Sequence, residues 1–198
     1  MFTLTSEVLR KTMPNLSAAR AQEFAPELTQ GMSKWGIDTW DEITMFLANL
    51  AHESGEFRWM EEIWGPTTQQ LKYERNFSAP WQEGLRPGDP NYVAFNLGNA
   101  NKGDGRRYSG HGPIQVTGAT NHLLMGFILE QDFLANPLLL TTTHWGVQAA
   151  CVYWWNNRLD DKAKKSFVAV VKGINGGTIG LADREKYLNL ARAAIPKF

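Results

Sequence analysis

The first clear pattern in the chain is a set of apolar residues at helical spacing. They recur at intervals of three or four residues and are Phe24, Leu28, Met32 and Trp35. This spacing places them on one face of a helix, which can bury that face and expose the other. Ser17 is suited to cap the first turn of this helix, and Gly36 is suited to end it. We therefore predict a helix between these two residues.

A second helix is predicted directly after the first. Thr39 and Glu42 have the spacing of a capping box, in which each side chain binds the backbone of the other residue. The apolar positions that follow are Ile43, Phe46, Leu47, Leu50 and Ala51. This helix should end near Ser54 and Gly55.

The rest of the chain divides into a loop-rich middle and a helical end. Prolines interrupt residues 65–90, glycine and polar residues dominate residues 98–118, and this middle third is expected to consist mostly of loops and short helices. Helical patterns then cover residues 119–129, 143–155, 161–172 and 182–194. Alternating strand patterns are nearly absent, apart from a short extended piece expected at 114–116. We predict one mainly α domain over residues 1–198, with long loops and little or no β structure.

Composition narrows the range of partners. Basic and acidic side chains number 20 each, so the net charge of zero does not favour nucleic acid or an anionic membrane. No apolar stretch approaches the roughly 18 residues of a membrane span, and residues 1–7 lack the features of a signal peptide. We therefore expect synthesis in the cytoplasm and no membrane insertion. Cys151, the only cysteine, excludes an internal disulfide and is expected to be a buried structural thiol.

Glu53 is the first candidate for chemistry. It follows Leu50 by three residues and Phe46 by seven, so helical spacing places it at the end of the buried face. A carboxyl group partly removed from water holds its proton more readily and can donate it to a leaving oxygen, as a glycosidase requires. The alternative is a structural glutamate that bends toward solvent or pairs with Arg58.

The histidines do not indicate a metal site. His52 and Glu53 resemble the beginning of a zinc-binding helix, but that pattern needs a second histidine where this chain has Glu56. The other three histidines show no ligand spacing and are expected to be hydrogen-bonded residues of loops or the core. They are His111, His122 and His144. We expect neither a metal ion nor an organic cofactor.

Three further glutamates follow Glu53 within nine residues, and they are Glu56, Glu61 and Glu62. An inverting glycosidase needs its two carboxyl groups roughly 6.5–9.5 Å apart, with a water between them. A carboxylate reached after the break at Gly55 could meet that distance. Spacing alone does not choose among the three, and a cluster of acids is also typical of a solvated surface.

The loop at residues 108–118 combines closely spaced glycines, a proline and polar side chains. If its second half is extended, Gln115 and Thr117 point to one side and the intervening aliphatic side chains to the other. The polar side would form a wall that holds sugar hydroxyls and an attacking water. The alternative is an ordinary glycine loop that leads into a helix.

Three motifs occur in order along the chain. They are Ala51-His52-Glu53-Ser54-Gly55, the run from Tyr108 to Gly118, and Ile174-Asn175-Gly176-Gly177. Together they resemble glycoside hydrolase family 19, in particular the endolysins of bacteriophages. The resemblance also takes in residues 46–50 and 180–184, so it covers nearly the whole chain from about residue 17 onward. It implies a lysozyme-like, mainly α fold and hydrolysis with inversion at the anomeric carbon.

The resemblance also assigns roles to individual residues. Glu53 matches the family's proton donor. In the endolysin branch the second acid falls nine residues later, which makes Glu62 the expected general base and leaves Glu61 as the alternative. Thr117 matches the threonine that helps to hold the catalytic water. Gln115 and Asn175 match polar cleft residues that bind substrate, and Tyr108 and His52, which lie in the same motifs, are also expected to bind substrate.

The chain departs from the family pattern close to the expected cleft. The family often has arginine at the positions of Ser109 and His111, tyrosine at His122, glycine at Glu56 and asparagine at Ile63. These departures concern sugar subsites and pH preference more than the reaction itself.

The resemblance implies an endolysin that hydrolyses the β-1,4 bonds of bacterial peptidoglycan, as a muramidase does, and lyses the host cell. Chitin shares this β-1,4 N-acetylglucosamine chemistry, so a chitinase is the first alternative. A non-catalytic wall-binding module and a bacterial toxin of the same chemistry are two others. The lack of a signal peptide, disulfides and a chitin-binding module favours the endolysin. We expect a monomer that is made in the host cytoplasm and reaches peptidoglycan glycan strands through a membrane opened by a separate permeabilising protein.

Overall fold

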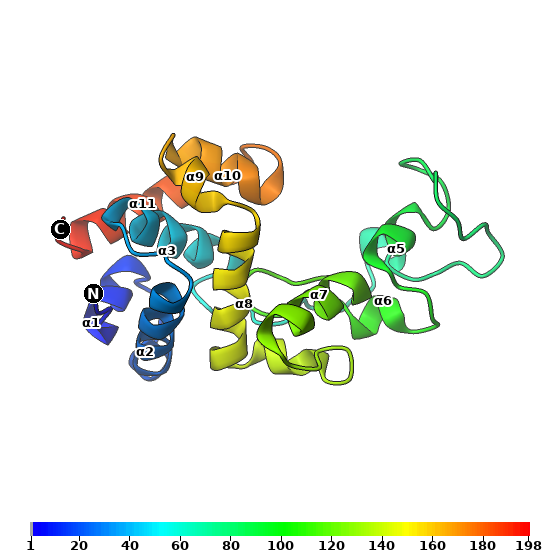
Figure 1. Ribbon diagram of the computed structural model, residues 1–198, viewed down its shortest axis with the longest axis horizontal. Coiled ribbons are helices and arrows are strands. Elements are labelled where there is room, and N and C mark those ends of the chain that lie inside the picture. The colour runs from blue at the N-terminus through cyan, green and yellow to red at the C-terminus, as the bar shows by residue number, and fades with distance from the viewer. Residues whose placement is uncertain (1) are drawn as a thin grey trace.

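The computed structural model describes residues 2–198, which form a mainly helical chain (Figure 1). In chain order the helices are α1 (Ser6–Thr12), α2 (Ala18–Lys34), α3 (Trp40–Ser54), α4 (Thr68–Leu71), α5 (Tyr92–Leu97), α6 (Asp104–Arg107), α7 (Ala119–Leu129), the 3₁₀ helix η1 (Pro137–Thr141), α8 (Thr143–Asn156), α9 (Leu159–Ala163), α10 (Phe167–Asn175) and α11 (Leu181–Ala194). Within residues 2–198, β pairing consists of isolated bridges that His111 makes with Glu61 and Val116. The prediction of a mainly α structure with little β pairing is confirmed. No helix in this part of the chain has the length and apolar character needed to cross a membrane.

Helix α8 stands between two parts of the molecule (Figure 1). On one side lie α1, α2, α3 and α11, on the other lie α5, α6, α7 and the long loops of the middle third, and α9 and α10 lie beyond one end of α8. One set of α8 side chains, which includes Val147 and Trp154, joins the larger apolar cluster, while Ala149 and Val152 join the smaller one. Helix α8 has apolar residues on two faces, and each face packs against a different part of the molecule. Cys151 lies within it and is buried as predicted, and burial raises the pKa of its thiol.

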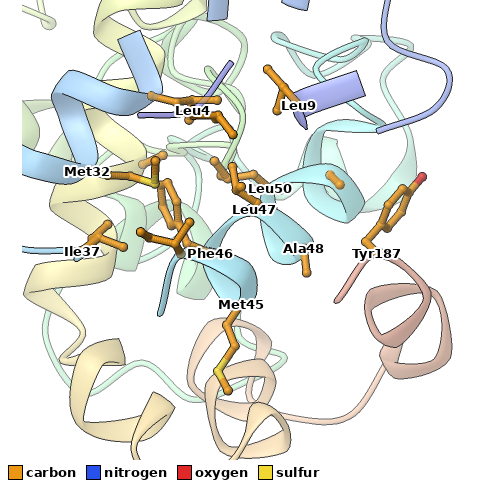
Figure 2. Close-up of a cluster of buried hydrophobic side chains, with 14 of the residues drawn as sticks. Leu4, Leu9, Met32, Ile37, Met45, Phe46, Leu47, Ala48, Leu50 and Tyr187 are labelled. Carbon is orange, nitrogen blue, oxygen red and sulfur yellow. The ribbon is translucent and has the colours of Figure 1, made fainter. Parts of the chain in front are cut away.

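Helix α3 forms the centre of the larger cluster. The predicted capping box is present at its beginning, where Thr39 Oγ1 accepts a hydrogen bond from the backbone N–H of Glu42 at 3.2 Å. Its apolar side chains, Phe46 and Leu50 among them, meet residues from the N-terminal segment and α2 (Figure 2). It also packs along α11. Because α3 is buried along nearly its whole length, the residues at its end are held in fixed positions.

Most of the predicted helices are confirmed to within one or two residues, but the single helix predicted over 161–172 is wrong. Two helices occupy this part of the chain, because α9 ends at Ala163 and α10 begins after Ser166. Ser166 has an extended backbone, and its side chain accepts a hydrogen bond from the Ala169 N–H at 3.1 Å. This local cap outweighs the continuous helical spacing of the apolar residues. Helices α1 and η1 are short and were not predicted.

The extended piece predicted at residues 114–116 is also wrong. Gln115 has a left-handed backbone with φ of +53°, and its N–H donates to the Gly112 carbonyl at 3.1 Å. The side-chain amide of Gln115 donates to the same carbonyl at 2.9 Å. A tight turn therefore replaces the strand, and Gln115 and Thr117 do not alternate with aliphatic neighbours across a flat wall.

The chain leaves α3 through a left-handed turn at residues 55–57, where φ is 55° to 61°. This conformation costs a non-glycine residue roughly 1–2 kcal/mol. Glu56 is 5% exposed, and its carboxylate accepts hydrogen bonds from the backbone and side chain of Asn15, at 2.5 and 2.7 Å, and from the Tyr187 hydroxyl at 2.8 Å. These contacts hold the turn in place and direct Glu56 toward the loop before α2 and toward α11.

Replacing Glu56 with glutamine removes the charged acceptor of three hydrogen bonds and places an amide donor opposite other donors. We expect the free energy of unfolding to fall by about 1–3 kcal/mol, as measured by denaturant unfolding. Glu7→Gln is the matched control, because Glu7 is exposed and pairs with Lys11 at the surface, where ion pairs add little stability. Equal stability losses in the two variants would contradict the anchoring role of Glu56.

Candidate active site

Glu53 lies in the last turn of α3 and is paired with an arginine from α11. Arg184, which is 1% exposed, donates from Nη2 to Oε1 of Glu53 and from Nη1 to Oδ1 of Asn49, the latter at 2.7 Å. Asn49 lies one turn before Glu53, so the planar guanidinium holds two side chains of the same helix face. The partner of Glu53 is therefore Arg184 and not Arg58. Within residues 2–198 no hydrogen bond engages Oε2 of Glu53, whose side chain is 26% exposed, so this oxygen is free to meet a substrate.

A second pair lies beside the first. His52 Nδ1 is 2.7 Å from Asp183 Oδ2, so consecutive residues of α3 meet consecutive residues of α11. The His52 ring also lies against Gly180, where an added Cβ atom would come within 2.5 Å of His52 Nε2. In this structure His52 joins α3 to the beginning of α11. Its role in substrate binding stays a prediction.

A pocket of about 130 Å³ is lined by Glu53 and by Asn175 at the end of α10. The structure thus brings together two of the residues predicted for the site. Tyr153 and Ile114 form part of the same wall. Burial, together with the negative charge of Glu53, raises the pKa of Tyr153, and the positive charge of Arg184 opposes this shift. Tyr153 is therefore a neutral hydroxyl group beside the Glu53 carboxylate.

A neighbouring pocket of about 280 Å³ shares Ile114 and Tyr153 with the first. Its lining includes Gln115 and Thr117, two further residues predicted for the site. Thr117 Oγ1 donates a hydrogen bond to the Gln115 carbonyl at 2.9 Å, which fixes the hydroxyl relative to the turn. The two pockets are therefore adjacent, with Ile114 and Tyr153 lining both.

Glu62 is held by the loop at residues 108–118. The Gly110 N–H donates to Oε2 of Glu62 at 2.9 Å, and the Gln70 side chain donates to Oε1 at 2.9 Å. Glu62 lines a separate open groove of about 830 Å³, together with Glu61. The structure therefore ties Glu62 to the loop that carries Thr117, but it does not place Glu62 and Glu53 in one pocket. The base role of Glu62 stays a prediction.

Tyr108 is mostly buried at the start of the same loop. Its hydroxyl donates to the Leu134 carbonyl at 3.2 Å, and its ring centroid lies 5.2 Å from that of His122. These contacts connect the loop to the chain after α7. A contact between Tyr108 and substrate stays a prediction.

Sequence reasoning missed Arg184 and Tyr153 as site residues. Arg184 falls at helical spacing with Leu181, Tyr187 and Ala191, which are buried or partly buried residues of α11. A charged residue on such a face must find a partner, because an isolated buried charge is costly. That signal could have marked Arg184, although it could not have named Glu53 as the partner.

The chain is similar to glycoside hydrolases in sequence, although no family model matches it. It is 31% identical over 157 residues to a glycosyl hydrolase family 19 domain-containing protein of Haemophilus influenzae, and the match covers 72% of this chain and 74% of that protein. It is 28% identical over 139 residues to the endochitinase EP3 of Arabidopsis thaliana, covering 70% of this chain and 43% of the endochitinase. The matched region therefore spans less than half the length of this plant endochitinase.

Solved structures of chitinases have a similar fold. Chitinase C from Streptomyces griseus matches with a TM-score of 0.65 at 20% identity, over 98% of this chain and 92% of that one. A class IV, family 19 chitinase from Zea mays matches with a TM-score of 0.64 at 17% identity, over 96% of this chain and 90% of that one. At these identities the similarity establishes the fold, and the predicted mainly α, lysozyme-like fold is confirmed.

Replacing Arg184 with lysine keeps the positive charge but removes the planar fork that reaches Glu53 and Asn49 at once. We expect the free energy of unfolding to fall by about 1–3 kcal/mol, because one buried acceptor loses its partner. Denaturant unfolding measures this loss. Arg192→Lys is the control in the same helix, since Arg192 pairs with Asp41 at the surface. A loss no larger than that of the control would contradict the central position of Arg184.

Proposed function

This chain belongs to glycoside hydrolase family 19, and we propose that it hydrolyses the β-1,4 glycosidic bonds of bacterial peptidoglycan as an endolysin. The observation that carries the proposal is the Glu53 carboxylate, which Arg184 holds by one oxygen at the wall of a pocket. This pocket adjoins the one that Thr117 lines, and Tyr153 lines both pockets. A positioned acid beside polar side chains is the arrangement that glycoside hydrolysis requires.

Glu53 is the proposed proton donor. Its proton passes to the glycosidic oxygen while the bond from that oxygen to the anomeric carbon breaks. Arg184 occupies Oε1, so Oε2 is the oxygen that would carry the proton to the substrate. The reaction leaves Glu53 ionised, and exchange with solvent restores its proton.

Glu62 is the proposed general base. It takes a proton from a water molecule that attacks the opposite face of the sugar ring, so the product has inverted configuration. Both Glu62 oxygens accept hydrogen bonds, whereas Glu61 is exposed and its carboxylate accepts none within residues 2–198. The fixed position of its carboxylate favours Glu62 over Glu61 as the base, because a correctly oriented base lowers the barrier of proton transfer. Thr117 is proposed to hold the attacking water.

Peptidoglycan is proposed as the substrate because the motif around Glu53, the acid nine residues later and the loop at 108–118 resemble those of endolysins. Chitin hydrolysis is the second candidate. It is favoured by the similarity to an endochitinase of Arabidopsis thaliana and to the chitinase structures. Both polymers contain β-1,4-linked N-acetylglucosamine, so one acid and one base could serve either.

We also propose where the enzyme is made and where it acts. As an endolysin it would be made in the cytoplasm of a bacterial host and act as a monomer on glycan strands. Peptidoglycan lies outside the cytoplasmic membrane, so a separate permeabilising protein would open the path to it. A toxin delivered into competing bacteria would use the same chemistry, and a neighbouring immunity gene would identify that case.

Glutamine variants test the catalytic roles. Glu53→Gln cannot donate a proton and Glu62→Gln cannot accept one, so each should lose about 10²- to 10⁴-fold in hydrolysis at a temperature where the variant is still folded. Release of reducing ends from purified peptidoglycan measures the loss. Glu61→Gln is the matched control and should keep most activity. Wild-type hydrolysis by Glu53→Gln, or a larger loss in Glu61→Gln than in Glu62→Gln, would overturn these assignments.

The substrate is tested by comparing purified peptidoglycan with colloidal chitin. We expect the wild-type enzyme to release reducing ends about tenfold faster or more from peptidoglycan, a difference of about 1.4 kcal/mol in transition-state stabilisation. Faster release from chitin would support the second candidate. Co-sedimentation with cell walls that remain intact would instead identify a binding module without catalysis.

A further inference from the structure

Two buried histidines face each other beneath the loop that carries Gln115 and Thr117. His111 and His122 are 2% and 0% exposed, and Nδ1 of His111 lies 2.9 Å from Nε2 of His122. The two rings meet edge to face, with centroids 5.1 Å apart. Neither imidazole takes part in the proposed proton transfers.

The second contact of His122 fixes where the hydrogens lie. Its Nδ1 is 2.8 Å from the Gly118 carbonyl oxygen, which can only accept, so Nδ1 carries a hydrogen. In the neutral ring Nε2 is then an acceptor, and His111 must donate to it from Nδ1. The hydrogen-bonded chain therefore runs from His111 through His122 to Gly118.

Hydrogen bonds to the histidine pair anchor the residues on both sides of Thr117. On one side of Thr117, the backbone of Val116 exchanges two hydrogen bonds with that of His111, at 2.8 and 3.1 Å. On the other side, Gly118 is bound by the His122 ring. The side-chain bond between the two histidines closes the ring, so both neighbours of Thr117 are anchored to the same pair.

We propose that His111 and His122 are positioning residues that fix Thr117 in the active site, and that they do so only while both rings are uncharged. The inference rests on the proposed function, because it assumes that Thr117 acts on the attacking water. The histidines act through the loop and do not themselves contact the reacting atoms.

The surroundings of the pair offer little compensation for a positive charge. The titratable or charged side chains next to it are Tyr108, Arg107, Glu61 and Glu62. The Tyr108 ring is tilted against that of His122, and Arg107 lies over the Tyr108 ring. Glu61 pairs with His111 through the backbone, and the Glu62 carboxylate accepts from the Gly110 N–H. Helix α8 packs against α7, and its side chains Ala149 and Val152 belong to the smaller apolar cluster. None of these groups contacts an imidazole nitrogen within residues 2–198.

We expect low pH to disrupt the hydrogen bond between His111 and His122. Burial lowers the pKa of His111 to about 4, with His122 contributing in the same direction, and burial also lowers the pKa of His122. An unfolded histidine titrates near 6.5, so between about pH 6.5 and 4 the unfolded chain binds more protons than the folded one and stability falls as pH falls. A proton on Nε2 of His122 would also face the Nδ1 hydrogen of His111 and break their bond.

Two variants of His122 and one control separate positioning from mere packing. His122→Phe keeps an aromatic ring but removes both hydrogen bonds, whereas His122→Gln retains a donor and an acceptor in a group that does not titrate. His144→Gln is the control, because His144 is exposed and pairs with Glu27. The kcat and KM of each enzyme are measured on soluble peptidoglycan glycan strands from pH 4 to 8. The backbone amide resonance of Thr117 is followed in the same range.

We expect His122→Phe to lose about tenfold or more in kcat at pH 7, with little change in KM, because the water-holding group is misplaced. His122→Gln should keep most of kcat at pH 7 and move the acid limb of the profile to lower pH. The control should match the wild type. If His122→Phe does not fold, His122→Gln carries the test alone.

An unchanged kcat and an unshifted Thr117 resonance in His122→Phe, or an acid limb in His122→Gln that matches the wild type, would overturn the proposal. If the wild-type enzyme cleaves neither peptidoglycan nor chitin, the proposed function fails. The Thr117 resonance then tests separately whether the histidine pair fixes the loop.

Discussion

The pairing of Arg184 with Glu53 and Asn49 is the interaction on which the rest of the structure depends. It joins α3 to α11 across 131 positions of the sequence, and α3 is the helix around which the larger apolar cluster is built. A guanidinium that is 1% exposed is costly to bury without partners, and Glu53 and Asn49 accept hydrogen bonds from its two terminal nitrogens. The end of the chain must therefore fold back onto α3 before the Glu53 carboxylate has a defined position.

The site forms where α3, α8 and the loop at residues 108–118 come together. Helix α8 contributes Tyr153, which lines both pockets, and the loop contributes Ile114, which does the same. Because the two faces of α8 belong to different apolar clusters, the two parts of the molecule are fixed relative to each other by packing on one helix. This places the pocket of Glu53 beside that of Thr117 without any direct hydrogen bond between these two residues.

Buried polar groups do much of the positioning around this site. The Glu56 carboxylate holds the turn after α3, and the histidine pair holds the turn before α7. Both features occur where the chain departs from the usual pattern of family 19, and hydrogen bonds engage both oxygens of Glu56 and both ring nitrogens of His122. A buried polar atom without a partner costs about 1–3 kcal/mol, so such networks favour one arrangement over near alternatives. The chain thus fixes its loops with hydrogen bonds where the apolar core does not reach.

The sequence by itself determined the helices with strong local signals, and it placed Glu53 at the end of a buried face. The Thr39 capping box and the apolar spacing of α2 and α3 act within a few residues, so they can be identified without the fold. The tertiary structure alone decided that Glu53 pairs with Arg184, that Gln115 lies in a turn, and that His111 meets His122. These contacts depend on which distant surfaces pack together, and neither helical spacing nor turn preference in a single segment contains that information.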